Sequence, residues 1–169
     1  MIGRAKYAVF VALLATSAQV TAAEWKLQPA VEGHGAVLTY GSGEAVSYKF
    51  ECVPAGMLVT ETGVTKLLDL RTGETIKDGP NAVMPAGAAL MALYGGKGEP
   101  KFVPAEAVKN SAGGWDLTIR LKRDDKQLKA IGKSEMISLF TTGFTMAVTM
   151  DDTARVSWND FMQRCNATL

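Results

Sequence analysis

Residues 115–121 read Trp-Asp-Leu-Thr-Ile-Arg-Leu, an alternation in which every second residue is apolar. Successive side chains of a β-strand point to opposite faces, so a period of two predicts a strand with one buried and one solvated face. Val46, Tyr48, Phe50 and Cys52 follow the same pattern, as does the segment 144–150. Six weaker strand candidates cover 25–31, 36–40, 57–62, 66–70, 88–94 and 135–141.

Residues that favour turns separate these candidate strands. The clusters lie at 41–43, 54–56, 71–73, 78–81, 95–98 and 111–114. Each is rich in glycine, proline, serine, threonine or asparagine, which end strands and form turns. Short strands between closely spaced turns are typical of antiparallel sheets. The predicted fold class is therefore mainly β, an antiparallel β-sandwich or barrel.

Two segments have helical spacing instead. We expect Asp124 to cap a short helix that contains Leu128 and Ile131 and ends at Gly132. A longer C-terminal helix should begin at Asp151, Asp152 and Thr153, which supply cap residues and favourable charge. Its apolar residues recur at spacings of three and four, which predicts one buried stripe. They are Ala154, Trp158, Phe161, Met162 and Cys165.

The chain has two cysteines, Cys52 and Cys165. The strand pattern places Cys52 on the same face as Tyr48 and Phe50, and the helical stripe places Cys165 on the buried face. A single disulfide from the sheet to the closing helix is the favoured interpretation. The alternatives are a metal pair or a redox pair, but the chain lacks the CxxC spacing that these usually need.

The N-terminal segment is typical of a secretory signal. Arg4 and Lys6 precede an uncharged apolar run over 7–15, and small residues occupy 21–23 before Glu24. The run is too short for a spanning helix, which needs about 20 apolar residues, so we expect cleavage rather than a membrane anchor. The predicted domains are a signal peptide over 1–23 and a single β-rich domain over 24–169. The expected location is periplasmic or secreted, with no stable membrane insertion after cleavage.

The net charge of the chain gives only limited information about the kind of partner that it binds. The formal net charge of the whole chain is +1, and removing Arg4 and Lys6 makes it −1. A near-neutral domain offers no general attraction to nucleic acid, so nucleic acid is not an expected partner. An envelope or host protein is the partner that we expect.

No residue set matches a catalytic, cofactor or metal motif. His34 is the only histidine, and no serine lies in a GxSxG turn, so a hydrolase triad has no sequence support. One histidine and two paired cysteines provide too few zinc ligands. The adjacent carboxylates 124–125 and 151–152 are better explained as helix caps than as acid and base. We therefore expect no cofactor and no enzymatic activity.

Two features remain candidates for contact with a partner. One is the set of loops with His34 and with Gly95, Gly96, Lys97 and Gly98. The glycine-rich loop does not open a helix, since Pro100 follows it, so a long hairpin turn is favoured over a phosphate-binding P-loop. The other is a basic cluster, for which a solvated helix face is favoured and a patch for an anionic ligand or partner is the alternative. It comprises Lys122, Arg123, Lys126, Lys129 and Lys133.

The order of features resembles that of the invasion-associated locus B family of exported proteobacterial proteins. The resemblance rests on the strand Tyr48-Lys49-Phe50-Glu51-Cys52, the Trp-led strand 115–121 and the terminal Phe161-Met162-Gln163-Arg164-Cys165. It covers much of the chain after residue 23. It implies a β-sandwich at the cell envelope, associated with envelope stress or host contact, and it transfers no catalytic residue.

A second resemblance is to periplasmic lysozyme inhibitors, which are small disulfide-bonded β-barrels. Tyr48 and Cys52 are spaced two residues wider than the Tyr-x-Cys of that family, and 86–90 keep its glycine without its serine and tyrosine. The leading functional hypothesis is a non-enzymatic binding or accessory protein of the bacterial envelope. A lysozyme inhibitor and a hydrolase with an unrecognised site are the alternatives.

Overall fold

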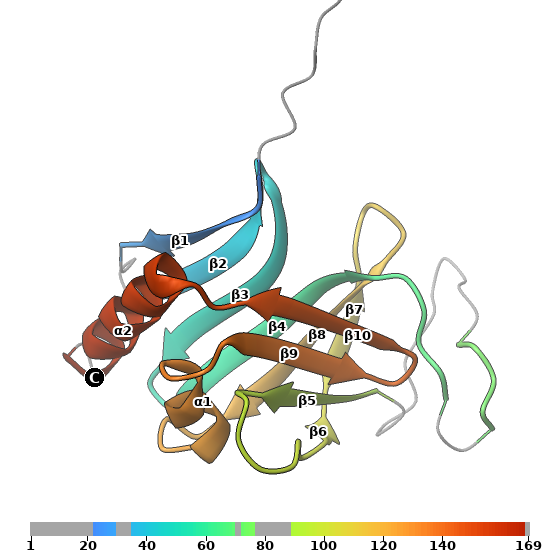
Figure 1. Cartoon of the computed structure of the whole chain (residues 1–169). Helices are drawn as coiled ribbons and strands as arrows, with labels where there is room; N and C mark the ends of the chain where they lie inside the picture. The colour runs from blue at the N-terminus through green and yellow to red at the C-terminus, as the bar shows by residue number, and fades with distance from the viewer. Residues whose placement is uncertain (1–21, 30–34, 70–71, 77–88, 168–169) are drawn as a thin grey trace, which may run out of the picture.

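A computed structural model describes residues 22–29, 35–69, 72–76 and 89–167 (Figure 1). Within them, antiparallel strands form two sheets. The six-stranded sheet has the order β1-β2-β3-β4-β8-β7 and the four-stranded sheet the order β10-β9-β5-β6. The strands of the first sheet are β1 (Glu24–Gln28), β2 (Val37–Ser42), β3 (Ala45–Val53), β4 (Gly56–Val64), β7 (Glu106–Lys109) and β8 (Trp115–Leu121). Those of the second are β5 (Leu90–Tyr94), β6 (Val103–Pro104), β9 (Met136–Thr141) and β10 (Phe144–Thr149).

One face of the first sheet is covered partly by the second sheet and partly by a C-terminal helix. Helix α2 (Asp152–Ala167) packs beside β1 and β2, and the strands β9 and β10 cross in front of β4 and β8 (Figure 1). A shorter helix, α1 (Lys126–Ile131), connects β8 to β9 and buries Leu128 and Ile131. The predicted mainly β, sandwich-like architecture with a short helix and a C-terminal helix is confirmed.

The alternation of apolar residues decides which side chains enter the core. Tyr48, Phe50 and Cys52 are fully buried, and β8 has the predicted bounds 115–121 with Trp115 and Leu117 facing inward. Removing such apolar side chains from water is the main term that favours this packing.

Val46 departs from the predicted pattern. Tyr40 pairs with Tyr48 but Gly41 pairs with Val46, so a bulge adds Ser47 to β3. A bulge leaves one residue out of the pairing and changes the face of those beyond it. Val46 is therefore 37% exposed, and the prediction that it shares the face of Tyr48 is wrong.

Three further predictions of local structure need correction. The segment 66–69 is not a strand: Leu68 only bridges Thr75, and Leu70 lies outside the described residues. The strands β6 and β7 lie outside the predicted strands. Both are short edge strands, and an edge position is where a sheet tolerates a proline such as Pro104. The cap of α1 is Asp125, whose carboxylate accepts from the Gln127 amide at 2.8 Å, and not Asp124.

The closing helix is attached as the cysteines predict. A disulfide joins Cys52 of β3 to Cys165 of α2, with 5.7 Å between their Cα atoms and a sequence separation of 113. Beside it, the rings of Trp158 and Phe161 pack on Phe50 with centroid distances of 5.1 and 6.5 Å. The bond is typical of proteins that fold outside the reducing cytoplasm. Neither described helix is long and apolar enough to cross a membrane.

Candidate functional site: a lysine-lined pocket

A pocket of about 850 Å³ lies between the loop that follows β5 and helix α1. One wall is the loop 95–99, and the other consists of residues between 126 and 134. Strand β5 runs toward α1, which brings the loop against the helix (Figure 1). The pairing of β5 with β6 confirms the long hairpin turn. The loop residues predicted to contact a partner all line the pocket: Gly95, Gly96, Lys97 and Gly98.

Four lysines surround this pocket. Lys97 comes from the loop, and Lys126, Lys129 and Lys133 follow at spacings of three and four, which places them on one side of α1 and its end. All four are exposed, and none has a salt bridge or hydrogen bond through its ammonium group within the described part of the chain. Glu99 is the one acidic residue of the lining, so the net charge is +3. The pocket is therefore strongly electropositive although the whole chain is nearly neutral.

The side chain of Gln127 holds the loop against α1. Its carbonyl oxygen accepts from the Gly95 amide at 2.8 Å, and its amide nitrogen donates to the backbone carbonyls of Lys97 at 3.0 Å and of Glu99 at 3.2 Å. Three hydrogen bonds thus connect one side chain to both ends of the loop. The wall that carries Lys97 is fixed before any ligand arrives, which lowers the entropy lost on binding.

Two glycines permit this close approach. A Cβ at Gly95 would lie 2.4 Å from the backbone carbonyl oxygen of Gln127, and one at Gly96 would lie 2.4 Å from the hydroxyl oxygen of Ser134. Gly96 also has a φ of +81°, a left-handed conformation that other residues rarely adopt. Gly98 is left-handed as well, but a Cβ added there would meet no atom within 4 Å. The loop therefore needs glycine at 95 for contact with α1, at 96 for contact with Ser134 beyond the end of α1, and at 98 only for backbone shape.

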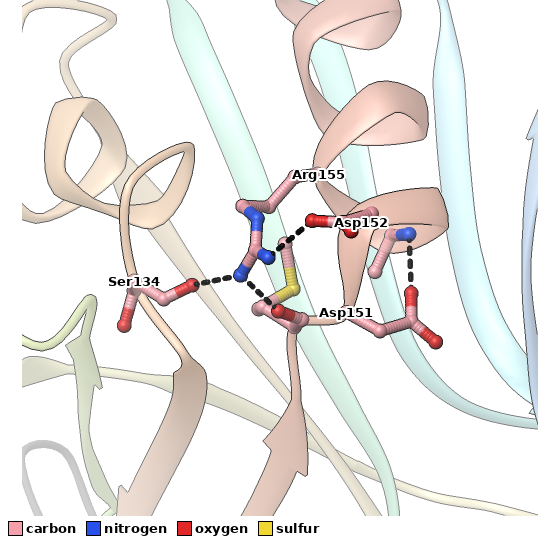
Figure 2. Close-up of polar contacts among 6 residues, drawn as sticks. Ser134, Asp151, Asp152 and Arg155 are labelled. Atoms are coloured by element: carbon pink, nitrogen blue, oxygen red, sulfur yellow. Dashed lines mark hydrogen bonds and ion pairs between the residues drawn. The ribbon is translucent and has the colours of Figure 1, made fainter.

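Ser134 connects the pocket to the closing helix. Its hydroxyl donates to the Met136 carbonyl at 2.5 Å, and its own carbonyl accepts from Arg155 at 3.3 Å. Figure 2 shows Arg155 reaching from the first turn of α2 toward Ser134, while it also forms an ion pair with Asp152 at 2.6 Å. Asp151 caps α2 by accepting from the Ala154 amide at 2.7 Å, as predicted.

A smaller hollow adjoins the pocket on the side of α2. It has a volume of about 310 Å³, and Lys129 and Lys133 line both hollows. Trp158, Asn159 and Met162 of α2 form its far side. Two of the four lysines therefore stand on a ridge between two concave surfaces and can contact a ligand that occupies either one.

The most unusual titratable group lies elsewhere, in the core. Glu61 of β4 is fully buried, and neither carboxylate oxygen has a hydrogen-bond partner among the described residues. Burial raises its pKa from 4.5 to about 8, because a charged carboxylate loses its hydration there. Neither pocket includes Glu61. A group that a substrate does not reach is better explained as part of the fold than as a catalytic acid or base.

Tyr48 lies opposite Glu61 in the pairing of β3 with β4. Its hydroxyl donates to the Met146 carbonyl of β10 at 2.5 Å and so joins the two sheets. Burial raises the pKa of the Tyr48 hydroxyl, and the Glu61 carboxylate raises it further. Both groups are therefore neutral near pH 7, which is the form that an apolar interior tolerates.

The remaining candidates from the sequence do not join the pocket. His34 lies outside the described residues. The basic cluster is divided: Arg123 donates to the carbonyls of Val53 at 3.2 Å and Pro54 at 2.9 Å, and Lys122 is exposed outside the lining. The three remaining cluster lysines are the ones that combine with Lys97.

Three residues of interest were not identified from the sequence. Gln127 and Ser134 act through contacts with loop residues that lie 32 and 38 positions earlier in the chain, which no local pattern reveals. The burial of Glu61 could have been predicted from the sequence, because this residue continues the alternation that places Met57 and Val59 on the inward face of the strand. A charged residue at such a position predicts a buried carboxyl.

Comparisons with known proteins add no family to this picture. No protein-family model matches the chain, and no curated protein or solved structure matches it. In the described segments, no group of three or more His, Cys, Asp or Glu side chains is arranged to hold a metal ion.

Proposed function

We propose that this chain is an exported, non-enzymatic binding or accessory protein of the bacterial cell envelope. The N-terminal segment with its cleavage-type residues supports export, and β1 begins at Glu24, directly after the expected cleavage point. The Cys52–Cys165 bond supports an oxidising destination. The resemblance in feature order to the invasion-associated locus B family supports the same placement.

The single observation that carries the binding role is the set of four ammonium groups around one pocket, none of which has a partner among the described residues. Four like charges close together repel one another, so an anion that enters the pocket removes an unfavourable interaction as well as adding a favourable one. A volume of about 850 Å³ lies within the range of sites that hold one small ligand or one group of a larger partner. The pocket is therefore proposed as the contact site for an anionic group of an envelope or host component.

Export is tested by the mass of the protein isolated from the periplasmic and extracellular fractions of a bacterial host. The expected mass is that of residues 24–169, lower by two hydrogens until the disulfide is reduced. A full-length mass with free thiols would contradict both the compartment and the processing.

The binding role is tested by titrating the purified, oxidised protein with small anions. We expect saturable binding that weakens as salt rises, because exposed charges are screened within about 10 Å at 0.1 M ionic strength. Exchanging one lysine of each wall, Lys97→Gln with Lys129→Gln, should weaken binding. The control Lys101→Gln with Lys122→Gln removes the same charge from exposed positions outside the lining and should leave binding unchanged.

A further inference from the structure

The chemistry of the lining narrows the class of anion. All the positive charge comes from lysine, and the lining contains no arginine. The flat guanidinium of arginine matches a carboxylate with two parallel hydrogen bonds, whereas the lysine ammonium is a compact point charge on a flexible stem. Several point charges around one volume suit an anion whose charge is spread over many oxygens in three dimensions, as it is in phosphate groups.

The lining also lacks surfaces that other anionic ligands need. It contains no aromatic side chain, so a nucleobase or an aromatic acid would have no ring to stack on. Ala130 is the one purely aliphatic side chain of the lining, so its apolar surface belongs mainly to the stems of charged and polar side chains and offers no continuous bed for a fatty-acid chain. The four ammonium groups and the absence of an aromatic ring from the lining therefore favour a compact, highly charged ligand group.

The spread and amount of charge indicate more than one phosphate. The ammonium groups come from opposite walls, the loop and α1, and the net charge of the lining is +3. A single phosphate carries less than two negative charges at neutral pH and would contact one wall more closely than the other. Two linked phosphates supply more charge and span more of the volume, and the loop that carries Lys97 is already fixed by Gln127.

We propose that the pocket between the β5–β6 loop and α1 is a binding site for a diphosphate group. This inference rests on the proposed function and names the chemistry of its ligand. The diphosphate can belong to a soluble ester or to the headgroup of a lipid, because the residues of the lining contact only the charged group. Lys97 and the three lysines of the α1 wall bind the phosphate oxygens.

The test is calorimetric titration of the oxidised protein at pH 7.5 with inorganic pyrophosphate, with citrate as a carboxylate of similar charge. We expect pyrophosphate to bind at a 1:1 ratio and about tenfold or more tightly than citrate. In Lys97→Gln with Lys129→Gln the affinity for pyrophosphate should fall by at least about tenfold, because the loss of even one of the two charged hydrogen bonds has an effect of that size. The control Lys101→Gln with Lys122→Gln should retain the wild-type affinity.

The possible results distinguish a failure of the diphosphate inference from a failure of the proposed anion-binding pocket. Citrate binding as tightly as pyrophosphate would overturn the diphosphate inference and leave an anion pocket. No saturable binding of either anion would overturn both. Equal loss in the pocket variant and its control would show general attraction to charge and would also overturn the site.

A second measurement identifies the source of the diphosphate. The protein is sedimented with phosphatidylcholine vesicles that contain a long-chain prenyl diphosphate, and with vesicles of phosphatidylcholine alone. Pyrophosphate-sensitive binding to the first vesicles only assigns the site to a lipid headgroup. Pyrophosphate binding in solution without vesicle binding assigns it to a soluble ester. Vesicle binding that pyrophosphate does not displace would contradict the proposed site.

Discussion

Glu61 and the four pocket lysines are ionisable groups without a counter-charge among the described residues, and their surroundings are opposite. Glu61 is fully enclosed between the sheets, where neither of its oxygens has a partner among the described residues. The lysines are exposed around a pocket, where water hydrates each ammonium. Glu61 is protonated and neutral near pH 7 because it is buried, whereas the four lysines around the pocket are exposed and keep their charge.

The difference determines how each group affects the protein. A buried carboxyl is made tolerable by taking up a proton, so its presence should appear in the stability of the fold as the pH changes. Exposed lysines keep their charge and contribute little to stability, so their presence should appear in the binding of an anion as salt changes. Stability and binding should therefore be separable by mutation.

The largest effect should come from removing the disulfide. Cys52→Ala with Cys165→Ala opens a loop that separates the cysteines by 113 residues, and we expect unfolding free energy to fall by about 4 to 5 kcal/mol. Urea unfolding measures this loss. The affinity of the remaining folded protein for pyrophosphate should not change, because the bond lies outside the pocket lining. A parallel loss of affinity would contradict the independence of interior and pocket.

The next effect is the pH dependence that Glu61 imposes. Its pKa is about 8 in the folded protein and 4.5 ordinarily, so between these values the folded chain holds a proton that the unfolded chain releases. Stability should therefore fall as pH rises through this interval, by about 1.4 kcal/mol per pH unit.

Glu61→Gln is the matched variant, since it keeps the shape and removes the titration. Urea unfolding at pH 5 and pH 8 should show a wild type that loses stability relative to the variant at the higher pH. A constant difference between the two proteins across this range would show that Glu61 does not stay protonated in the fold.

A smaller effect distinguishes two glycines of the loop. Gly96→Ala introduces a Cβ 2.4 Å from Ser134 Oγ at a φ of +81°, whereas Gly98→Ala meets no atom within 4 Å at a φ of +74°. Both should lose about 1 to 2 kcal/mol through the left-handed backbone. Only Gly96→Ala should also displace the loop from Ser134 and weaken pyrophosphate binding. Equal binding by the two variants would show that contact with Ser134 does not shape the pocket.

The smallest effect on stability is expected at the lysines themselves. Lys129→Gln should change the unfolding free energy by no more than about 0.5 kcal/mol, as is usual for exposed residues without specific partners. In low salt the sign should be stabilising, because one like charge is removed from the group. Thermal unfolding at low and high salt checks this, and a large destabilisation would identify Lys129 as a structural residue.

The fold was largely accessible from local pattern. Alternation at 115–121 and around Phe50 fixed the inward faces, and the helical stripe together with this alternation predicted that Cys52 and Cys165 meet. The incorrect predictions lie where the pairing between strands, and not the local pattern, decides the structure. A bulge reversed Val46, and an edge strand accepted Pro104.

The candidate site was accessible only in parts. The glycine loop and the basic cluster were each visible, but their union in one pocket depends on β5 pairing with β9, which directs the loop to α1. Gln127 makes its decisive hydrogen bonds to residues about 30 positions away. Sequence spacing alone does not reveal such contacts, so the alternative of an anion-binding patch gained support only from the structure.

The most direct test of the central claim is an amide-resolved NMR titration of the oxidised protein with inorganic pyrophosphate. Saturable shifts should be confined to amides of 95–99 and 126–134, while those of β3 and β4 around Tyr48 and Glu61 stay in place. That result would establish a surface anion site that is independent of the buried carboxyl. Absent shifts, or shifts that do not saturate or that centre on other surfaces, would contradict it.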